Sequence, residues 1–342
     1  MKRIGICIAG LNGAVATTVV AGVALMRRGL AAPVAMLSEN YRDSHKLAPL
    51  ESFVCGGWDV RGGNCVDAAL RNRVVEPLRL QPIAKELAAL KPWKPNPKTL
   101  ARDIERFRRK HKLETVVVLN LLPTGLHAET KAFALAAAQT SSSFINFTPN
   151  DCGEENLSAI PFCGSDGKTG QTWLKSILAP AFRARSLRVT GWYSTNLLGN
   201  EDGRVVGDPQ QGKAKIDSKS KLLADMLGYA PHHQVQINFY PPRGDNKESW
   251  DNIDFDGFLG MPMQLKVNGL WRDSILAAPM CIDLARFMEL AQRRGEKGAQ
   301  EWLSFYFKSP ATRDAKNPPP HDGHAQSLAL HQFLANCVGQ NL

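Results

Sequence analysis

Small residues dominate the stretch Gly10-Leu11-Asn12-Gly13-Ala14-Val15-Ala16. Residues 3–9, which precede it, are mostly apolar, as in a buried strand. Residues 14–28, which follow it, are apolar up to Arg27-Arg28-Gly29, a typical helix C-terminus. This order predicts a strand, a tight turn and a helix. Such a turn lets the pyrophosphate of a dinucleotide approach the backbone N–H groups at the helix N-terminus.

The turn departs from the GxGxxG pattern of dinucleotide-binding folds at two places. Asn12 stands where the second glycine is expected, and Ala16 closes the pattern. A turn of this kind also joins ordinary buried strands and helices. The motif therefore needs support from the rest of the chain.

The same segment imitates a secretory signal. Lys2-Arg3 precedes an uncharged run that contains Ala14-Val15-Ala16, which looks like a cleavage site. Four glycines and Asn12 interrupt this run, whereas the core of a signal peptide is continuously apolar. We therefore expect a folded N-terminus rather than secretion or membrane insertion.

Length and composition indicate a folded protein with more than one core. The 342 residues predict two domains, and 44% hydrophobic residues are enough to bury their cores. The net charge of +10 favours an anionic partner such as nucleic acid, a membrane surface or a phosphorylated metabolite. The seven cysteines include no CxxC pair, which favours reduced thiols in a cytoplasm over disulfides or a zinc site.

The first half of the chain alternates strands with helices. Strands are predicted at residues 34–37, 52–55, 115–119 and 144–147, and helices at 66–90, 99–112 and 128–139. The continuous apolar run Val116-Val117-Val118-Leu119 is typical of a parallel strand that helices cover on both faces. This pattern predicts an α/β fold with a Rossmann-type, doubly wound parallel sheet.

The pattern changes beyond residue 171. Helices are predicted from there to residue 183 and at 213–227, 275–293 and 325–337, and strands at 187–193, 234–240, 253–259 and 263–270. The last three strands alternate apolar and polar residues, which indicates a sheet with two different faces. We therefore expect a second, α+β domain with a largely antiparallel sheet, whose apolar face meets another subunit.

Two polar features invite other interpretations. The basic run at residues 106–112 resembles a nucleic-acid patch, but a solvated helix end with cations near its C-terminus is favoured. His232-His233 and His321-Asp322-Gly323-His324 resemble metal ligands, but neither has a known ligand spacing, so polar loops are favoured.

Four lysines lie beside unusual neighbours. Lys215 and Lys219 are four residues apart in a predicted helix, so two like charges share one face and repel. Lys247 follows a turn with two prolines, and Lys308 ends the aromatic run at residues 305–307. Each of them alone is best interpreted as a surface lysine.

Nine segments change that interpretation, and they cover nearly the whole chain. They are residues 10–19, 57–59, 120–125, 165–172, 196–203, 215–220, 244–247, 273–274 and 307–310. Together, and in this order, they resemble the inositol-3-phosphate synthase family, also called myo-inositol-1-phosphate synthase. The length and Leu122-Pro123-Thr124-Gly125 are similar to its shorter prokaryotic forms. The chain departs from the family at Asn12, Ala14, Val15 and Phe147-Thr148.

The resemblance implies an NAD-dependent isomerase that converts D-glucose 6-phosphate into 1L-myo-inositol 1-phosphate with no net redox change. Oxidation at C5 acidifies the proton on C6, the enolate attacks the C1 aldehyde, and the hydride then returns. This chemistry needs cations for a phosphate and for two oxyanions, and it needs a base of lowered pKa.

The resemblance also implies site residues. The catalytic set is Lys215, Lys219, Lys247, Lys308, Asp166, Asp245 and Asp273. Within it, Lys215 would handle the proton of the C5 hydroxyl, Lys247 and Lys308 would stabilise the C1 and C5 oxygens, and the aspartates would orient these groups. The substrate phosphate would be held by Lys168, Lys219 and Asn196. The cofactor would contact Gly10, Asn12, Gly13, Ala14, Val15, Asp59, Leu122, Thr124, Thr148, Asp166, Thr169, Asn200, Asp202, Asp273 and Ser274.

The expected organisation follows from the same resemblance. Residues 1–172 and 277–342 would form an NAD-binding domain, and residues 173–276 a catalytic and tetramerisation domain. We expect a homotetramer that binds a sugar phosphate and neither nucleic acid nor membrane. Asp59 would accept hydrogen bonds from ribose hydroxyls and repel a 2′-phosphate, which predicts NAD rather than NADP. A requirement for a divalent or monovalent cation stays open.

Three alternatives remain. An NAD(P)-dependent dehydrogenase of the homoserine or saccharopine type would share the architecture but would accumulate NADH. A related cyclase would use the same groups on another sugar phosphate. A basic nucleic-acid-binding protein would account for the charge, but the chain has no matching aromatic and basic motif.

Overall fold

The computed structural model describes residues 3–199 and 222–339. The chain forms two compact units. The first contains the described residues of 1–167, 277–319 and 330–342, and the second those of 168–276 and 320–329. Every helix in the described part of the chain is too short or too polar to cross a membrane.

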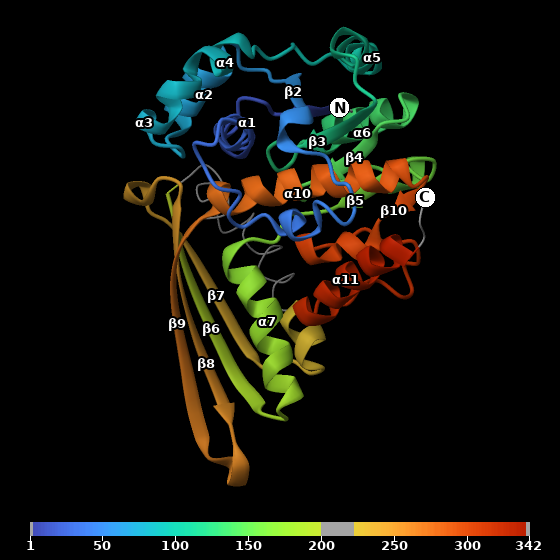
Figure 1. Cartoon of the computed structure of the whole chain (residues 1–342). Coiled ribbons are helices and arrows are strands. Elements are labelled where there is room, and N and C mark those ends of the chain that lie inside the picture. Colours follow the sequence, from blue (N-terminus) through green and yellow to red (C-terminus); the bar gives the residue numbers. More distant parts are fainter. Residues whose placement is uncertain (1–2, 200–221, 340–342) are drawn as a thin grey trace. The chain divides into compact units, whose positions relative to one another are not determined.

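A parallel sheet of six strands forms the centre of the first unit (Figure 1). Its strands are β1 (Ile4–Ala9), β2 (Phe53–Trp58), β3 (Thr115–Asn120), β4 (Ser143–Asn146), β5 (Pro161–Gly164) and β10 (Gly298–Ala299). They lie in the order β10-β5-β4-β3-β1-β2, and every neighbouring pair is parallel. The chain moves outward in opposite directions from β1 and β3, so the carboxyl ends of these two strands flank the switch point where such sheets bind ligands.

Helices cover both faces of this sheet. They are α1 (Ala14–Arg27), α2 (Cys65–Asn72), α3 (Pro77–Leu80), α4 (Ala84–Ala89), α5 (Leu100–His111), α6 (His127–Gln139), α10 (Asp273–Arg293) and α11 (Gly323–Gly339). The first residues of α10 and of α11 are counted with the second unit. Short 3-10 helices lie at Leu37–Tyr41, Leu50–Ser52, Gln81–Ile83, Glu154–Asn156, Pro241–Arg243, Phe258–Gly260 and Glu301–Tyr306.

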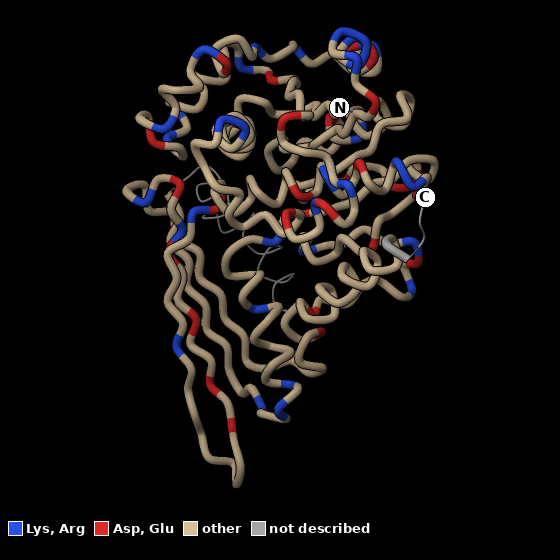
Figure 2. Tube along the Cα trace, viewed as in Figure 1, with Lys and Arg blue, Asp and Glu red and all other residues tan. Residues whose placement is uncertain are grey.

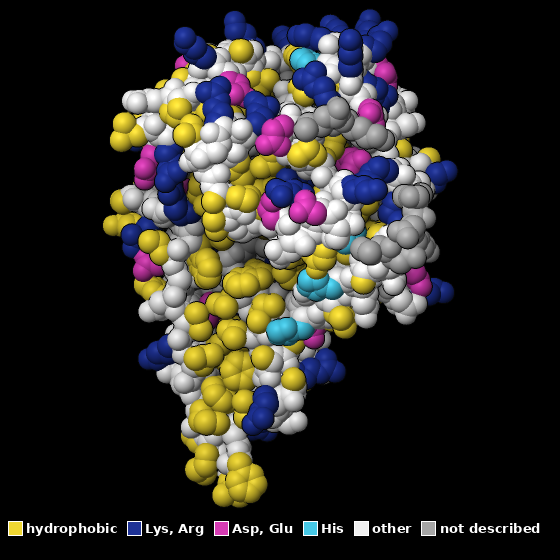
Figure 3. All heavy atoms as spheres, in the orientation of Figure 1, with side chains coloured by type: hydrophobic (Ala, Val, Ile, Leu, Met, Phe, Trp, Pro, Cys, Tyr) yellow, Lys and Arg dark blue, Asp and Glu magenta, His cyan; other side chains and the backbone are white. Residues whose placement is uncertain are grey.

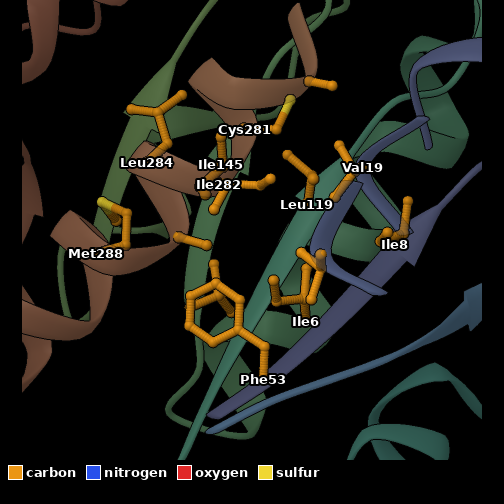
Figure 4. Packing of buried hydrophobic residues seen from close by; sticks show 14 of the residues in the cluster. Ile6, Ile8, Val19, Phe53, Leu119, Ile145, Cys281, Ile282, Leu284 and Met288 are labelled. Carbon is orange, nitrogen blue, oxygen red and sulfur yellow. The ribbon is translucent and has the colours of Figure 1, made fainter. Parts of the chain in front are cut away.

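The continuous apolar run in β3 is explained by burial on both faces. Val117 and Leu119 join the cluster formed with α1 and α10, and Figure 4 shows Leu119 beside Val19 of α1 and Cys281 of α10. Val116 and Val118 join the other cluster, formed with α5 and α6. Burial of each such side chain contributes about 2 kcal/mol. The predicted doubly wound sheet is therefore confirmed.

Two predicted elements of this unit are wrong. Residues 34–37 form no strand, because the Asp283 carboxylate of α10 accepts hydrogen bonds from the backbone N–H groups of Leu37 and Ser38, which start a 3-10 helix. The single helix at 66–90 is three: α2 stops where Arg73 adopts a left-handed conformation (φ 56°), and α3 restarts with Pro77 in its first turn. The short strands β5 and β10 had no predicted counterpart.

The second unit contains a mixed, four-stranded sheet with α7 along one face (Figure 1). Its strands are β6 (Arg188–Leu198), β7 (His232–Phe239), β8 (Asn246–Asp256) and β9 (Pro262–Arg272), in the order β7-β6-β8-β9, and α7 spans Gly170–Ala184. The β6–β7 pair is parallel and the other two pairs are antiparallel. Phe182 of α7 packs with Trp192 and Ile253 of the sheet in a separate core.

Candidate functional site

The glycine turn after β1 is shaped to receive an anion. Gly10 has φ 90°, and a Cβ there would lie 2.8 Å from the carbonyl oxygen of Leu121, so this position requires glycine. Gly13 precedes α1, and neither a side-chain cap nor an acidic residue occupies the first turn of that helix. Its N–H groups and the positive end of its dipole therefore suit a pyrophosphate.

Asn12, at the second glycine position of the pattern, is buried and ties this turn to the loop after β2. Its backbone N–H donates to Asp59 Oδ2 at 2.9 Å. Its side-chain amide donates to the carbonyl oxygens of Arg61 (3.0 Å) and Gly62 (3.2 Å). The side chain thus points away from the anion-binding face and holds the loop in place.

Asp59 lies beside the turn, as the sequence predicts, but it is buried and paired with Arg61 at 3.0 Å. Burial opposes its ionisation, yet the hydrogen bonds from Arg61 and Asn12 outweigh burial and lower the pKa of Asp59. It is therefore a buried carboxylate rather than an exposed one.

The carboxyl end of β3 contributes a polar network at the switch point. Asn120 donates to Asn146 Oδ1 at 2.9 Å and to Thr148 Oγ1 at 3.0 Å. Asn150 accepts from Gly125 N–H at 2.8 Å and donates to the carbonyl oxygen of Pro123 at 2.9 Å, which fixes the loop that carries Leu122 and Thr124. The predicted cofactor residues Leu122, Thr124 and Thr148 are thus brought to the same edge of the sheet as Gly10.

Asp166 and Lys308, two of the predicted catalytic residues, form an ionic pair in the first unit. Lys308 Nζ lies 2.9 Å from Asp166 Oδ1, and both side chains are 31% exposed. The backbone holds the pair as well: Lys308 N–H donates to the carbonyl oxygen of Asp166 at 2.8 Å, and Asp166 N–H donates to that of Thr148 at 3.1 Å. Phe147 lies against Gly167, where an added Cβ would come within 2.2 Å of the ring.

Lys247 and Asp273, also predicted catalytic residues, form an ionic pair in the second unit. Lys247 Nζ lies 3.8 Å from Asp273 Oδ2, and Thr169 Oγ1 donates to Asp273 Oδ1 at 3.3 Å. Beside them, Ser274 Oγ donates to Asp245 Oδ1 at 2.9 Å, while the buried Asp245 Oδ2 has no partner among the described residues. Burial raises the pKa of Asp245, and the charge of Asp273 adds to the effect. The structure thus brings together five of the predicted residues here.

Lys168 lies just before α7 and is buried, with Nζ donating to Gln326 Oε1. Burial lowers its pKa to about 8, an effect that Asp322 partly offsets. Thr169 precedes α7 without capping it through its side chain, and the first turn of α7 contains no acidic residue. A basic group and a helix N-terminus therefore meet at this point.

A buried polar chain in the second unit contains residues that the sequence did not single out. Asp251 accepts from Gln171 Nε2 at 2.8 Å, and Gln171 Oε1 accepts from Asn196 Nδ2 at 3.0 Å. Since a carboxylate only accepts, Asp251 fixes the orientation of both amides. Asn196 Oδ1 is then left as a buried acceptor with no partner among the described residues.

Lys175 completes this network. Its Nζ donates to Ser194 Oγ at 2.8 Å and lies 3.2 Å from His233 Nε2 and 3.8 Å from Asp251 Oδ1. Its side chain is only 4% exposed, and burial lowers its pKa to about 8, with Lys247 adding repulsion against the pull of Asp251. The sequence signal was a lysine four residues after Gln171, on the face of α7 that also carries Ala179.

Four of the predicted residues have no described position. Lys215, Lys219, Asn200 and Asp202 lie outside the described residues.

In residues 3–199 and 222–339, no group of three His, Cys, Asp or Glu side chains is arranged to hold a metal ion. Within the basic run of α5, Arg106 pairs with Asp103 and Arg108 with Glu105, and Figure 2 shows these charges concentrated on that helix.

Known proteins are similar to this chain over its whole length. The family described as myo-inositol-1-phosphate synthase matches residues 170–274. Inositol-3-phosphate synthase 1 of Bacteroides thetaiotaomicron is 35% identical to this chain. The match covers 99% of this chain and 96% of that protein. Two crystal structures share the fold. Inositol-3-phosphate synthase of Caenorhabditis elegans has a TM-score of 0.89 at 21% identity, and the match covers 98% of this chain and 86% of that one. A myo-inositol-1-phosphate synthase-related protein of Thermotoga maritima has a TM-score of 0.76 at 20% identity, and the match covers 97% of this chain and 98% of that one.

Proposed function

The chain belongs to the inositol-3-phosphate synthase family, and on that premise we propose that it isomerises D-glucose 6-phosphate to 1L-myo-inositol 1-phosphate with NAD as cofactor. The observation that carries the proposal is the 35% identity, over 99% of the chain, to a protein named for this activity. The pairs of lysine with aspartate in both units support it, because the chemistry needs positioned cations.

The turn at Gly10 has the features that a dinucleotide requires. When bound, NAD reversibly accepts a hydride. The part of this chain is to hold the pyrophosphate at the N-terminus of α1 and to keep Leu122, Thr124 and Thr148 at the adjacent strand end. The family resemblance also assigns Thr169, Asp273 and Ser274 to the cofactor.

Lys308 and Lys247 are assigned to the oxygens that gain negative charge. Each ammonium is oriented by a carboxylate, Asp166 at 2.9 Å and Asp273 at 3.8 Å. A cation that is already in place costs little reorganisation as the charge develops, which is how electrostatic stabilisation lowers a barrier. Asp245, which accepts a hydrogen bond from Ser274 at 2.9 Å, would help to orient these groups.

The N-terminus of α7 with Lys168 is assigned to the substrate phosphate, since a helix end without acidic residues and a nearby ammonium attract an anion. Asn196, which the family resemblance assigns to the phosphate, presents a side-chain carbonyl oxygen with no partner among the described residues. That oxygen suits a sugar hydroxyl better than a phosphate, which offers no proton to donate when fully ionised.

Self-association is also part of the proposal. The hairpin between β8 and β9 exposes large apolar side chains: Phe258 (87%), Leu259 (76%), Met261 (60%), Met263 (44%) and Leu265 (36%). Figure 3 shows hydrophobic side chains gathered over the part of the chain that contains this sheet. Apolar area of this kind favours burial against another copy, and we propose a homotetramer.

We place the protein in the cytoplasm, since the described residues contain all seven cysteines and none is in a disulfide. We also propose that residues 1–172 and 277–342 form the domain that binds NAD, and that residues 173–276 carry most of the catalytic groups.

The test is the identity of the product. The protein is incubated with glucose 6-phosphate and a catalytic amount of NAD, and the mixture is followed by ³¹P and ¹H NMR and by absorbance at the wavelength of NADH. The expected result is inositol phosphate in many-fold excess over NAD, with no accumulation of NADH. Stoichiometric NADH without inositol phosphate would instead indicate the dehydrogenase alternative, and conversion of only another sugar phosphate would indicate a related cyclase.

A further inference from the structure

The carboxylate of Asp59 has no capacity left for a ribose hydroxyl. Its Oδ1 accepts from the backbone N–H of Arg61 at 2.8 Å and from Arg61 Nε at 3.0 Å. Its Oδ2 accepts from Asn12 N–H at 2.9 Å and from Arg61 Nη2 at 3.1 Å. A carboxylate offers about four acceptor positions, so these four hydrogen bonds saturate it.

The pair of Asp59 with Arg61 is electrically neutral, and its two members differ in exposure. The Asp59 side chain is 3% exposed, whereas the Arg61 side chain is 50% exposed. A ligand that approaches the end of β2 therefore meets the guanidinium before the carboxylate. The repulsion that an exposed Asp59 would exert on a second phosphate is largely cancelled.

Arg61 is held next to the anion-binding turn. Its Nη2 lies 3.9 Å from the position that a Cβ on Gly13 would occupy. The amide of Asn12 fixes its backbone by donating to the carbonyl oxygens of Arg61 and Gly62. The bidentate contact with Asp59 fixes its side chain. The guanidinium is thus a positioned cation between the turn and the carboxyl end of β2, where Rossmann-type folds place the adenosine ribose.

We propose that Arg61 makes the ribose end of the cofactor site accept a 2′-phosphate, so that the protein binds NADP with an affinity comparable to that for NAD. The inference rests on the proposed function in one respect, that the turn at Gly10 holds a dinucleotide. In folds of this type an acidic residue after the second strand selects NAD and a nearby arginine accommodates NADP. Here both are present, and the arginine neutralises the acid.

The experiment measures binding without sugar phosphate. Isothermal titration calorimetry gives Kd values of the whole protein for NAD, NADP and adenosine 2′-monophosphate. The variants are Arg61→Ala, Arg61→Gln, which keeps a donor for Asp59 without the charge, and Arg102→Ala, which removes an exposed arginine of α5 as a control. Circular dichroism melting confirms that each variant is folded.

The wild type and the control should bind NAD and NADP within about tenfold of each other, and adenosine 2′-monophosphate should bind measurably. Arg61→Ala and Arg61→Gln each lose one charge-assisted contact with the 2′-phosphate. Both variants should therefore bind NADP about tenfold more weakly than the wild type, or weaker still. Binding of NAD should stay level or tighten, because Asp59 becomes available to the ribose hydroxyls. A gain in NAD selectivity on losing a cation is not expected of a merely structural residue.

Three results would overturn the inference. The first is a wild-type preference for NAD of more than about a hundredfold. The second is an equal weakening of NAD and NADP by both Arg61 variants, which would assign Arg61 to the pyrophosphate that the two cofactors share. The third is that neither NAD nor NADP binds to the protein. Failure of the proposed isomerase activity is separate, because product formation is not measured here.

Discussion

Substitution of Lys175 by Met tests the electrostatics of the buried network that surrounds it. Its ammonium is almost fully buried, and its pKa is lowered from 10.5 to about 8. Met matches the length of the side chain but does not titrate. Asp251 loses its cationic neighbour but keeps the hydrogen bonds from Gln171, Trp192 and Ser194, which continue to stabilise its carboxylate.

The lowered pKa predicts a difference between the two proteins that depends on pH. Between pH 8 and 10.5 the lysine is neutral in the folded protein and still protonated in the unfolded chain. The unfolded state then binds more protons, so the free energy of unfolding rises with pH. With pKa values of about 8 folded and 10.5 unfolded, this rise amounts to about 1.4 kcal/mol from pH 7 to pH 9. The variant lacks this rise.

Other groups titrate in the same range, and the comparison removes them. The buried thiols of Cys7 and Cys281 have raised pKa values, which lowers stability as the pH rises, but they contribute equally to both proteins. The assay is urea unfolding of the wild type and Lys175→Met at pH 7 and 9. Lys266→Met, which removes an exposed lysine of β9, is the control. A difference between wild type and Lys175→Met that stays constant to within about 0.3 kcal/mol would refute the reasoning.

The other predictions concern catalysis, packing and assembly. Lys247→Ala and Lys308→Ala should each lower kcat about a hundredfold, which is a loss of about 3 kcal/mol of transition-state stabilisation. The melting temperature should stay unchanged. Wild-type rates of inositol phosphate formation in both variants would contradict the assigned roles. Gly167→Ala places a methyl group 2.2 Å from the Phe147 ring and should lower the melting temperature, by an overpacking cost of about 1–3 kcal/mol that a second change, Phe147→Leu, partly relieves. Light scattering should show a tetramer at micromolar concentration and a smaller species for Leu265→Asp; a wild-type monomer would contradict the proposed interface.

Local sequence patterns were sufficient to predict the strands that are buried on both faces. The strand predicted at residues 115–119 is β3 (Thr115–Asn120), because burial on both faces leaves an unbroken apolar run in the sequence. The strand predicted at residues 34–37 failed because the group that captures its backbone N–H donors, Asp283, is more than 240 residues away. β5 was missed because Pro161 to Gly164 is too short to show a period.

The site shows the same limit more clearly. Asp166 and Lys308 are 142 residues apart, and nothing in either local sequence indicates that they meet. The family resemblance supplied both residues, together with Lys247, but did not pair them. Lys175 was missed because a lysine inside an amphipathic helix is usually solvated. The available signal was its place on the same helix face as Gln171 and Ala179, since a charged residue on an apolar face needs a buried partner.

The departure at Asn12 separates two requirements that the glycine fingerprint combines. At Gly10 the requirement is conformational, because φ is 90° and a side chain would collide with the Leu121 carbonyl oxygen. At Asn12 the backbone has no positive φ, so a side chain is tolerated if it turns away from the ligand. It does so by donating to the loop at Arg61 and Gly62, and the loop in turn places Arg61 over Asp59. If the proposed NADP binding holds, this one substitution in the motif leaves the turn free for a pyrophosphate and moves recognition of the ribose from a carboxylate to a guanidinium.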